Sequence, residues 1–229
     1  MKPYLKNNKT NKVEKAVTRR ITLKDIDELM RVQAAAVAAL DDPSVYVVSS
    51  RDDFKGILNR GGEIHGIFTK DGLCGACSVY VPGNPGESLG VEAGIPKNEL
   101  PLCANIDSVF VAPDYAHNGI ARELIKTCIN RAVENLGANY VLATVSPKNV
   151  PSILSFMSLN GVRLKALAQK YGYKLRYIMC YNHSDKRLFT VYERYALGDV
   201  YSISRALSNG YEGIATFKTE DDVFIWLAK

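Results

Sequence analysis

The segment that most constrains this chain is residues 103–136, in which a strand, a short loop and a long helix follow one another. Residues 103–111 predict a strand, and residues 113–118 predict a tight loop. From residue 119 to 136 the apolar side chains recur at helical spacing, with charged side chains on the opposite face. The apolar run at residues 140–145 is typical of a buried central strand. Strand, helix and strand in this order predict an α/β domain.

The same periodicities predict the remaining elements on both sides of this segment. Helices are expected at residues 22–40, 50–60, 151–159, 162–171 and 200–207, where the fourth helix resumes the third. Strands are expected at residues 16–21, 64–69, 73–81, 174–182, 187–196, 214–217 and 223–227. Residues 82–101 hold four prolines and four glycines, and they predict a long irregular loop of the kind that is often functional.

Basic charge is concentrated at the N-terminus, where residues 1–20 carry seven basic side chains against one acidic one. The rest of the chain is nearly neutral, with 22 basic and 23 acidic residues, so the net charge of +5 does not indicate a basic face of the fold. A basic arm can contact nucleic acid, but no aromatic interleaving supports that function here. We therefore predict a flexible, solvated leader over residues 1–15, and we do not expect a nucleic-acid partner.

Hydrophobicity and cysteine usage predict a cytoplasmic protein. No apolar run reaches the roughly 18–20 residues that cross a bilayer, and the polar N-terminus lacks the apolar stretch of a secretory signal. Five cysteines are an odd number, and they are scattered through apolar strands and a helix, which favours reduced thiols over a disulfide framework. No membrane association is expected.

The loop before the long helix has the features of a phosphate-binding site. A loop that enters a helix N-terminus presents unpaired backbone N–H groups and the positive end of the helix dipole. Such an end binds a phosphate or diphosphate without cationic side chains. Gly119 and Ala121 keep side-chain bulk away from that approach. An ordinary helix start is the alternative interpretation of these two small residues.

The extended pattern resembles the coenzyme-A-binding loop of the GNAT superfamily of N-acetyltransferases. Val111-Ala112-Pro113, Gly119 and Ala121 match that pattern in register, whereas Ala116 stands where Gln or Arg is usual. A second block agrees 30 residues on, where Asn149 and Ser152 fit and the usual Tyr is Phe156. The resemblance extends from Thr18 to about Tyr195 and so covers most of the chain.

The resemblance implies a GNAT-like α/β fold with a central mixed, mostly antiparallel sheet that is splayed between its fourth and fifth strands and flanked by helices. It implies acetyl-CoA as co-substrate and no metal. The backbone of the fourth strand would pair with the pantetheine arm. Asn149 would fix the same arm from the other side of the opening between the strands. The implied acetyl-CoA-binding residues are Val109, Phe110, Val111, His117, Asn118, Gly119, Ile120, Ala121, Arg122, Asn149, Ser152 and Phe156. Within this set the amide of Val109 would polarise the thioester carbonyl.

Catalysis requires a proton acceptor, because the ammonium form of an amine is not a nucleophile. Asp107 is the candidate base, since it shares a strand face with Val109 and Val111; a structural, hydrogen-bonded role is the alternative. The family often re-protonates the leaving thiolate with the tyrosine that is Phe156 here. Tyr171 or Tyr173 could replace it, or no acid is needed.

Domain boundaries follow from the extent of the resemblance. We expect a leader at residues 1–15, an acetyltransferase domain at 16–197, and a helix-plus-hairpin extension at 198–229 packed on the same domain. The terminal hairpin could pair with another subunit, so a homodimer is possible. Cys74 and Cys77 have the spacing of redox and zinc sites, but no second ligand pair accompanies them.

Three functions remain open at this point, and the third of them, an RNA-directed acetyltransferase or nucleic-acid binder, is motivated only by the basic leader. The first is transfer of an acetyl group from acetyl-CoA to the amine of a small molecule, peptide or protein. The acidic residues of the 82–101 loop favour a cationic acceptor. The second is a non-catalytic, acyl-CoA-binding regulatory module, which Ala116 and Phe156 motivate.

Overall fold

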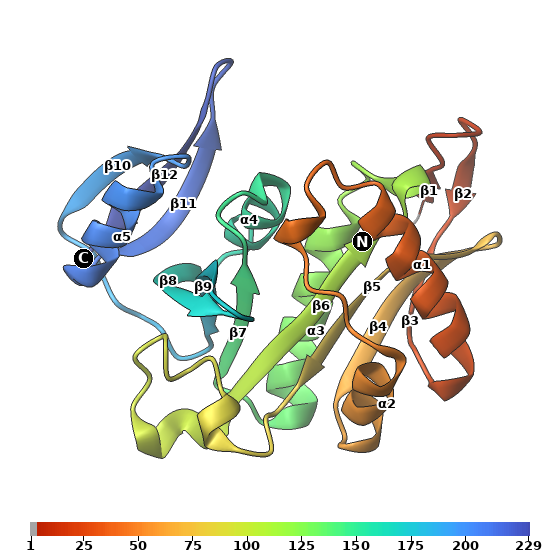
Figure 1. Cartoon of the computed structure of the whole chain (residues 1–229), viewed down its shortest axis with the longest axis horizontal. Helices are drawn as coiled ribbons and strands as arrows, with labels where there is room; N and C mark the ends of the chain where they lie inside the picture. The colour runs from red at the N-terminus through yellow and green to blue at the C-terminus, as the bar shows by residue number, and fades with distance from the viewer. Residues whose placement is uncertain (1–3) are drawn as a thin grey trace. The chain divides into compact units, whose positions relative to one another are not determined.

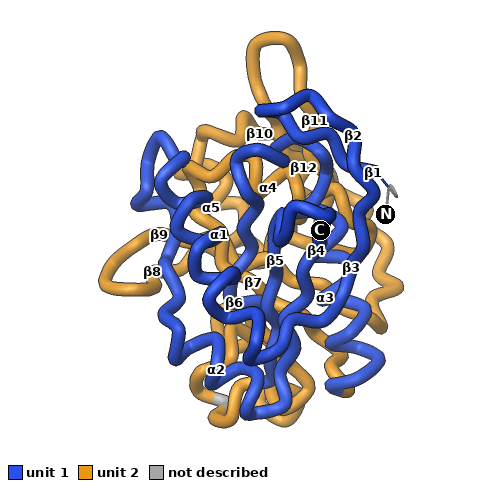
Figure 2. The backbone as a smooth tube through the Cα atoms, turned by 90° about the vertical axis from the view of Figure 1, so that its right-hand side faces the viewer, with its two compact units in different colours: residues 1–81, 106–136 blue, residues 82–105, 137–229 orange. Residues whose placement is uncertain are grey.

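The computed structural model describes residues 4–229, and these residues form two compact units of similar size. The first unit comprises residues 1–81 and 106–136, and the second comprises residues 82–105 and 137–229 (Figure 2). Each unit is thus built from two separate pieces of the chain. Residues 198–229, the expected extension, lie in the second unit together with residues 137–197.

The first unit is a sheet with helices on both faces (Figure 1). Its strands lie in the order β6-β5-β4-β3, and β4 pairs antiparallel with both β3 and β5. The strands are β3 (Val17–Arg20), β4 (Glu63–Thr69), β5 (Gly72–Tyr80) and β6 (Cys103–Val111), and the helices are α1 (Ile26–Ala38), α2 (Arg51–Asn59) and α3 (Ile120–Leu136). The predicted strand–loop–helix order from β6 to α3 is confirmed.

Alternation along β5 separates two packed layers. Ala76 belongs to the core that α1 and α2 cover, together with Phe54 and Phe110, whose rings meet edge to face at 6.4 Å. The neighbouring positions face α3: a Cβ on Gly75 would lie 3.0 Å from the Ile120 side chain. Because successive side chains of a strand point to opposite faces, β5 is buried on both sides. The sequence accordingly shows β5 as a nearly continuous apolar run.

Capping residues set where α2 begins. The Ser50 backbone amide donates to Asp53 Oδ2 at 2.7 Å, and the Asp53 amide donates to Ser50 Oγ at 3.1 Å. This reciprocal pair satisfies two of the amides that the first helical turn leaves unpaired. It therefore fixes the end of the segment between α1 and α2, and Ser49 with it.

The second unit is a six-stranded antiparallel sheet with two short helices. Its strands lie in the order β10-β12-β11-β8-β9-β7. They are β7 (Tyr140–Val145), β8 (Val162–Lys170), β9 (Lys174–Asn182), β10 (Tyr192–Ala196), β11 (Glu212–Lys218) and β12 (Val223–Ala228), with helices α4 (Val150–Met157) and α5 (Val200–Ser208). The C-terminal strands join this sheet at Gly213, which pairs with Leu164. A Cβ on Gly213 would lie 2.7 Å from the Leu164 Cβ, so only glycine permits this approach.

Residues 162–170 form strand β8, so the prediction of a resumed helix at 162–171 was wrong. Leu, Lys, Ala and Gln favour a helix, but this segment also alternates, and Val162 and Leu164 are buried. Pairing with β9 along its length decides the outcome. The strand expected at 187–196 is shorter, because only Tyr192–Ala196 pairs with β12.

Residues 4–15 also differ from the expected flexible leader. They form a hairpin of β1 (Tyr4–Lys6) and β2 (Val13–Lys15), in which Leu5 is opposite Glu14. Residues 1–3 of the predicted leader lie outside the described residues. A charge count could not show this hairpin, because its apolar anchor is a single residue: Leu5 is 2% exposed.

The long loop predicted at 82–101 is confirmed as irregular, with 3-10 turns at Pro85–Glu87 and Lys97–Leu102. The predicted splay between the fourth and fifth strands concerns β6 and β7 and stays a prediction. Over residues 4–229, no helix is both long and apolar enough to cross a membrane.

Candidate functional site

The loop between β6 and α3 has an unusual backbone. It leaves β6 with the Ala112 amide donating to the Cys74 carbonyl at 2.8 Å, and a 3-10 turn follows at Pro113–Tyr115. His117 then adopts a φ of 63° and Gly119 a φ of 79°. Left-handed backbone at a non-glycine residue such as His117 is uncommon and signals local strain.

This backbone leaves donors unpaired at the N-terminus of α3. Among the residues that the structure describes, the amides of His117, Asn118 and Gly119 donate to no protein acceptor. The Glu123 amide closes the first helical turn onto the Gly119 carbonyl at 3.2 Å. The amides of the first turn itself, at Ile120, Ala121 and Arg122, have no intrahelical partner by helix geometry. A run of six main-chain donors therefore surrounds the positive end of a 17-residue helix.

Gly119 is required by its backbone angle. An added Cβ would have no heavy atom within 4 Å, so space does not exclude a side chain at this position. The positive φ does, because residues with a Cβ rarely adopt it. A pocket of about 310 Å³ lies at this loop, and its walls are Leu5, Ile67, His117, Asn118, Gly119, Ile120, Arg122 and Glu123.

Strand β6 carries the predicted catalytic and pantetheine-contacting residues. Asp107 is exposed, and Val109 and Val111 are half-buried on the same strand. Phe110 is 5% exposed and packs into the core, so only its main chain is available to a ligand. The residues of β6 that the sequence predicts to contact the pantetheine arm therefore lie directly before the loop with the unpaired amides.

Asp107 belongs to a polar cluster that sequence reasoning missed. Its Oδ2 accepts hydrogen bonds from Ser49 Oγ at 2.9 Å and from Ser108 Oγ at 3.0 Å. Gln33 holds Ser49 in place, because its Nε2 donates to the Ser49 carbonyl and its Oε1 accepts from the Ser49 amide. Tyr46 donates to the same Gln33 oxygen at 3.1 Å. The cluster fixes the Asp107 carboxylate from two sides.

One sequence signal could have revealed this cluster. Gln33 occupies an apolar position in the helical repeat of α1, and it is 1% exposed. A buried amide needs hydrogen-bond partners, so it marks a polar site inside the core. Burial raises the pKa of the nearby Tyr46 hydroxyl, which the Asp107 charge raises further.

The second predicted block lies in the other unit, at the start of α4. Asn149 caps this helix: its Oδ1 accepts from the Ser152 amide at 3.1 Å. The Asn149 Nδ2 has no protein acceptor among residues 4–229. Phe156 is 4% exposed and points into the core. Asn149 and Ser152 are thus adjacent as predicted, whereas the Phe156 side chain is not available to a ligand.

Tyr171 and Tyr173 lie in the turn between β8 and β9. Both adopt a positive φ, 52° and 75°, on either side of Gly172. The Tyr171 hydroxyl is 3.1 Å from Thr144 Oγ1, and Tyr173 is 86% exposed. Only Tyr171 therefore has its hydroxyl held by another residue.

The long 82–101 loop has fewer free acids than its sequence indicates. Glu92 accepts from Lys170 Nζ at 2.6 Å, and Glu99 accepts from the Tyr140 hydroxyl at 2.5 Å. In the part of the chain that the structure describes, only Glu92 is therefore neutralised by a cation, because Glu99 keeps its negative charge beside a neutral hydroxyl. The cationic acceptor stays a prediction.

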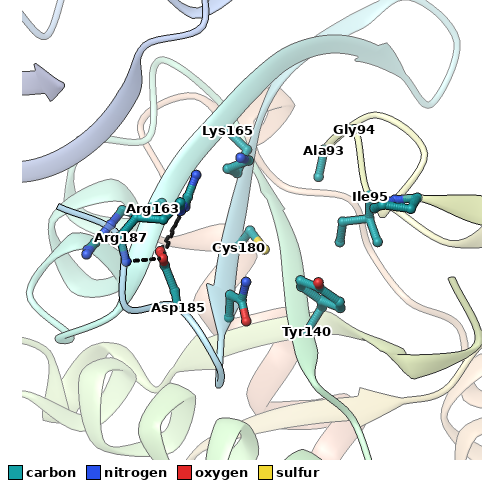
Figure 3. Close-up of a pocket in the computed structure, with 11 residues that line it drawn as sticks. Ala93, Gly94, Ile95, Tyr140, Arg163, Lys165, Cys180, Asp185 and Arg187 are labelled. Carbon is teal, nitrogen blue, oxygen red and sulfur yellow. Dashed lines mark hydrogen bonds and ion pairs between the residues drawn. The ribbon is translucent and has the colours of Figure 1, made fainter. Parts of the chain in front are cut away.

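The second unit has a separate pocket of about 220 Å³, drawn in Figure 3. Ile95 and Tyr140 lie on one side of it, and Arg163, Asp185 and Arg187 lie on the other. Arg187 pairs with Asp185 and with Glu212, and Lys165 pairs with Glu212 as well. The charges around this pocket thus largely neutralise one another.

The cysteines are buried as thiols within the described residues. Burial raises the pKa of Cys74, and burial together with neighbouring Cys128 raises that of Cys77. A raised pKa opposes the thiolate form that redox and metal chemistry require. No group of three or more His, Cys, Asp or Glu side chains in residues 4–229 is placed to hold a metal.

Comparison with known proteins gives one family and one fold. A model of the acetyltransferase (GNAT) family matches residues 34–159, which is more than half of the chain. This range contains β6, the α3 loop and the start of α4. It does not reach the hairpin at 4–15 or the strands after α4. No curated protein matches the chain.

Solved structures of acetyltransferases share the fold at low sequence identity. The putative acetyltransferase yncA from Salmonella typhimurium, solved with its cofactor acetyl-CoA, is 18% identical, with 77% of this chain and 98% of that chain covered and a TM-score of 0.55. The ribosomal-protein-S18-alanine N-acetyltransferase from Escherichia coli is 15% identical, with 76% and 99% covered and a TM-score of 0.55. The ribosomal-protein-alanine N-acetyltransferase from Brucella melitensis is 20% identical, with 72% and 99% covered and a TM-score of 0.53.

Proposed function

Because the chain belongs to the acetyltransferase (GNAT) family, we propose that it transfers the acetyl group of acetyl-CoA to an amine. The matching family model confirms the family that the loop motif predicted, and the solved acetyltransferase structures confirm the predicted α/β fold class. The one observation that carries the proposal is the run of unpaired amides at residues 117–122. Main-chain donors at a helix N-terminus bind a diphosphate, which is the part of CoA that such a loop can hold.

The residues at the loop fit that co-substrate. The amides at 117–122 supply donors, and Gly119 has the left-handed backbone that exposes them. On β6 we assign the main chain of Val109, Phe110 and Val111 to the pantetheine arm, with the Val109 amide on the thioester oxygen. The resemblance predicts that Asn149 contacts the same arm; within its own unit the Ser152 amide holds the Asn149 side chain in one orientation.

Asp107 is the proposed base. Its carboxylate is exposed, and Ser49 and Ser108 hold it in one position, which a proton acceptor needs. Asp107 accepts a proton from the acceptor ammonium, directly or through water. The neutral amine nitrogen then forms a bond to the acetyl carbon while the carbon–sulfur bond breaks. The nitrogen loses its second proton to water, and the thiolate takes a proton as it leaves. As the resemblance implies, Tyr171 is the candidate donor of that proton, which it recovers from water, and Thr144 holds the Tyr171 hydroxyl within their own unit.

The burial of Phe156 favours a second candidate function. A phenylalanine that packs into the core cannot donate a proton, so the usual acid is missing. If no other group replaces it, the chain would bind acyl-CoA without turning it over. Release of free thiol from acetyl-CoA, measured across a panel of primary amines and peptide N-termini, separates the enzyme from this binding module.

Gly119→Ala tests the loop, and the same helix provides its control. We expect Gly119→Ala to weaken CoA binding about tenfold or more in calorimetry, because a Cβ disfavours the required backbone. Gly137 ends α3 with a φ of 67° and has equally open space around it. Gly137→Ala should lower stability similarly and leave CoA affinity unchanged. Equal CoA affinity in both variants and the parent would refute the proposed site.

A further inference from the structure

The N-terminal hairpin, residues 4–15, is docked on the proposed phosphate-binding loop (Figure 1). It forms a separate two-stranded sheet and does not join the strands of its unit. A hairpin of two three-residue strands is marginal on its own, so its stability depends on what it contacts. It also lies outside the part of the chain that the family model matches.

Four hydrogen bonds join the turn side of the hairpin to the loop backbone or to Asn118. The Lys6 amide donates to Asn118 Oδ1 and Asn118 Nδ2 donates to the Lys6 carbonyl, both at 2.9 Å. The Asn8 amide donates to the Asp114 carbonyl at 2.7 Å, and Asn8 Nδ2 donates to the Ala116 carbonyl at 2.9 Å. These bonds use loop carbonyls and one side chain, so they consume none of the amides at 117–119.

Two side chains complete the docking on the buried face of the hairpin. Leu5 is one wall of the 310 Å³ pocket at the loop. Glu14, its cross-strand partner, accepts a hydrogen bond from the Tyr115 hydroxyl at 2.6 Å. The hairpin therefore contacts the loop directly before and directly after its strained residue, His117, and it opposes relaxation of that backbone.

The outer face of the hairpin is cationic. Lys6, Lys9, Lys12 and Lys15 are all exposed, whereas Glu14, its one acidic residue, is buried against Tyr115. The loop has Ala116 and Gly119 at its centre and offers main-chain donors there rather than cations. Four lysines beside a main-chain anion site make the local electrostatic potential more positive, which attracts a ligand with several negative charges.

We propose that this hairpin is part of the acyl-CoA site, where it holds the loop in its binding conformation and supplies the cations for the phosphates of CoA. The proposal rests on the proposed function, because it names the ligand of the same loop. The phosphate groups it concerns are those that the loop amides do not reach, above all the 3′-phosphate. The ligand proposed for the N-terminal lysines is therefore a small molecule, CoA. RNA binding by these lysines is the competing outcome of the test.

The holding function is tested with two tyrosines in matched surroundings. Tyr115→Phe removes the bond to Glu14, and Tyr211→Phe removes a bond of equal length, 2.6 Å, to Glu193 in the other unit. Tyr115→Phe should raise the Kd for CoA about five- to tenfold while kcat at saturating acetyl-CoA stays unchanged. It should also speed hydrogen exchange at the bonded amides of Asn8, Tyr115 and Ala116 without ligand. Tyr211→Phe should do neither.

The charge function is tested with CoA and dephospho-CoA, which lacks the 3′-phosphate. The double variant Lys9→Gln/Lys12→Gln should weaken CoA at least threefold more than dephospho-CoA and should reduce the salt dependence of CoA binding. Lys24→Gln/Lys55→Gln, on the α1 and α2 side of the same unit, is the control. Equal loss for both ligands, or loss of RNA binding in place of CoA selectivity, overturns the proposed cation function.

The outcomes separate this inference from the proposed function. A parent protein that binds no CoA would refute the proposed function itself. A parent protein that binds CoA, with Tyr115→Phe and Lys9→Gln/Lys12→Gln indistinguishable from it, would refute only the function of the hairpin.

Discussion

The Tyr115 hydroxyl donates to Glu14 Oε2 at 2.6 Å, although the two residues are 101 positions apart. This bond links an N-terminal hairpin to the loop that leads into α3. Glu14 has a lowered pKa, chiefly because of this hydrogen bond, although burial opposes the shift. Lys70, at 3.6 Å, and the side chains of Thr69 and Asp71 lower the pKa further. The stability of the hairpin therefore depends on whether the Glu14 carboxylate is ionised.

The first prediction concerns this ionisation. Since the pKa of Glu14 is lower in the folded protein, the stabilisation is present above its unfolded pKa of 4.5 and is lost as pH falls through the folded value. We expect the protection factors of residues 4–15, measured against the unstructured chain at the same pH, to fall below about pH 4. Glu14→Gln should show the low protection factors at all pH values. Protection factors in the parent protein that do not change with pH would contradict this dependence.

The second prediction concerns the base. Asp107→Asn keeps the shape of the side chain and removes the proton acceptor, so turnover should fall about tenfold or more while CoA affinity is unchanged. The acid limb of the pH–rate profile should change with it. Asp52→Asn, on exposed α2, should leave both unchanged. A pH–rate profile identical to that of the parent would exclude Asp107 from proton transfer.

The third prediction distinguishes the two tyrosines of the β8–β9 turn. Tyr171→Phe should lower kcat several-fold, because its hydroxyl is held by Thr144, whereas the exposed Tyr173 can be replaced without effect. Steady-state kinetics with a small amine acceptor measure both. Should neither variant change kcat, the thiolate leaves without a protein acid, which was the alternative from the sequence.

The fourth prediction concerns the ion pairs of the second unit. Burial alone would raise the pKa of Glu212, but bonds from Arg187 and Lys165 outweigh it and the pKa is lowered. Glu212→Gln leaves Lys165 without its carboxylate and Arg187 with Asp185 alone, and we expect a loss of about 1–3 kcal/mol in the free energy of unfolding by urea at pH 7. The difference between variant and parent should shrink below about pH 4, since protonation removes the same charge. A constant difference across pH would show that packing, not charge, is lost.

Much of the candidate site was predictable because it is local. The spacing of Val111, Pro113, Gly119 and Ala121 gave the loop, and the helical repeat after it gave α3. Both depend on residues within a few positions of one another, where sequence patterns are most informative. Asp107 followed from strand alternation on β6, and the structure adds that two serines hold it.

Other features were decided by contacts between distant segments. Residues 162–170 carry helix-favouring side chains, yet pairing with β9 and β11 makes them a strand. Ser49 reaches Asp107 across 58 positions, and only the buried Gln33 indicated that a polar cluster existed.

By itself the sequence determined the strand–loop–helix unit, because short-range periodicity produces it, and the resemblance of the loop motif gave the family. The phosphate-binding character of the loop stays a prediction. Tertiary structure alone decided that residues 4–15 are a docked hairpin rather than a solvated leader. One buried leucine, one tyrosine–glutamate bond and four hydrogen bonds of Lys6 and Asn8 to the loop hold it there, and contacts between such distant residues leave no pattern in sequence.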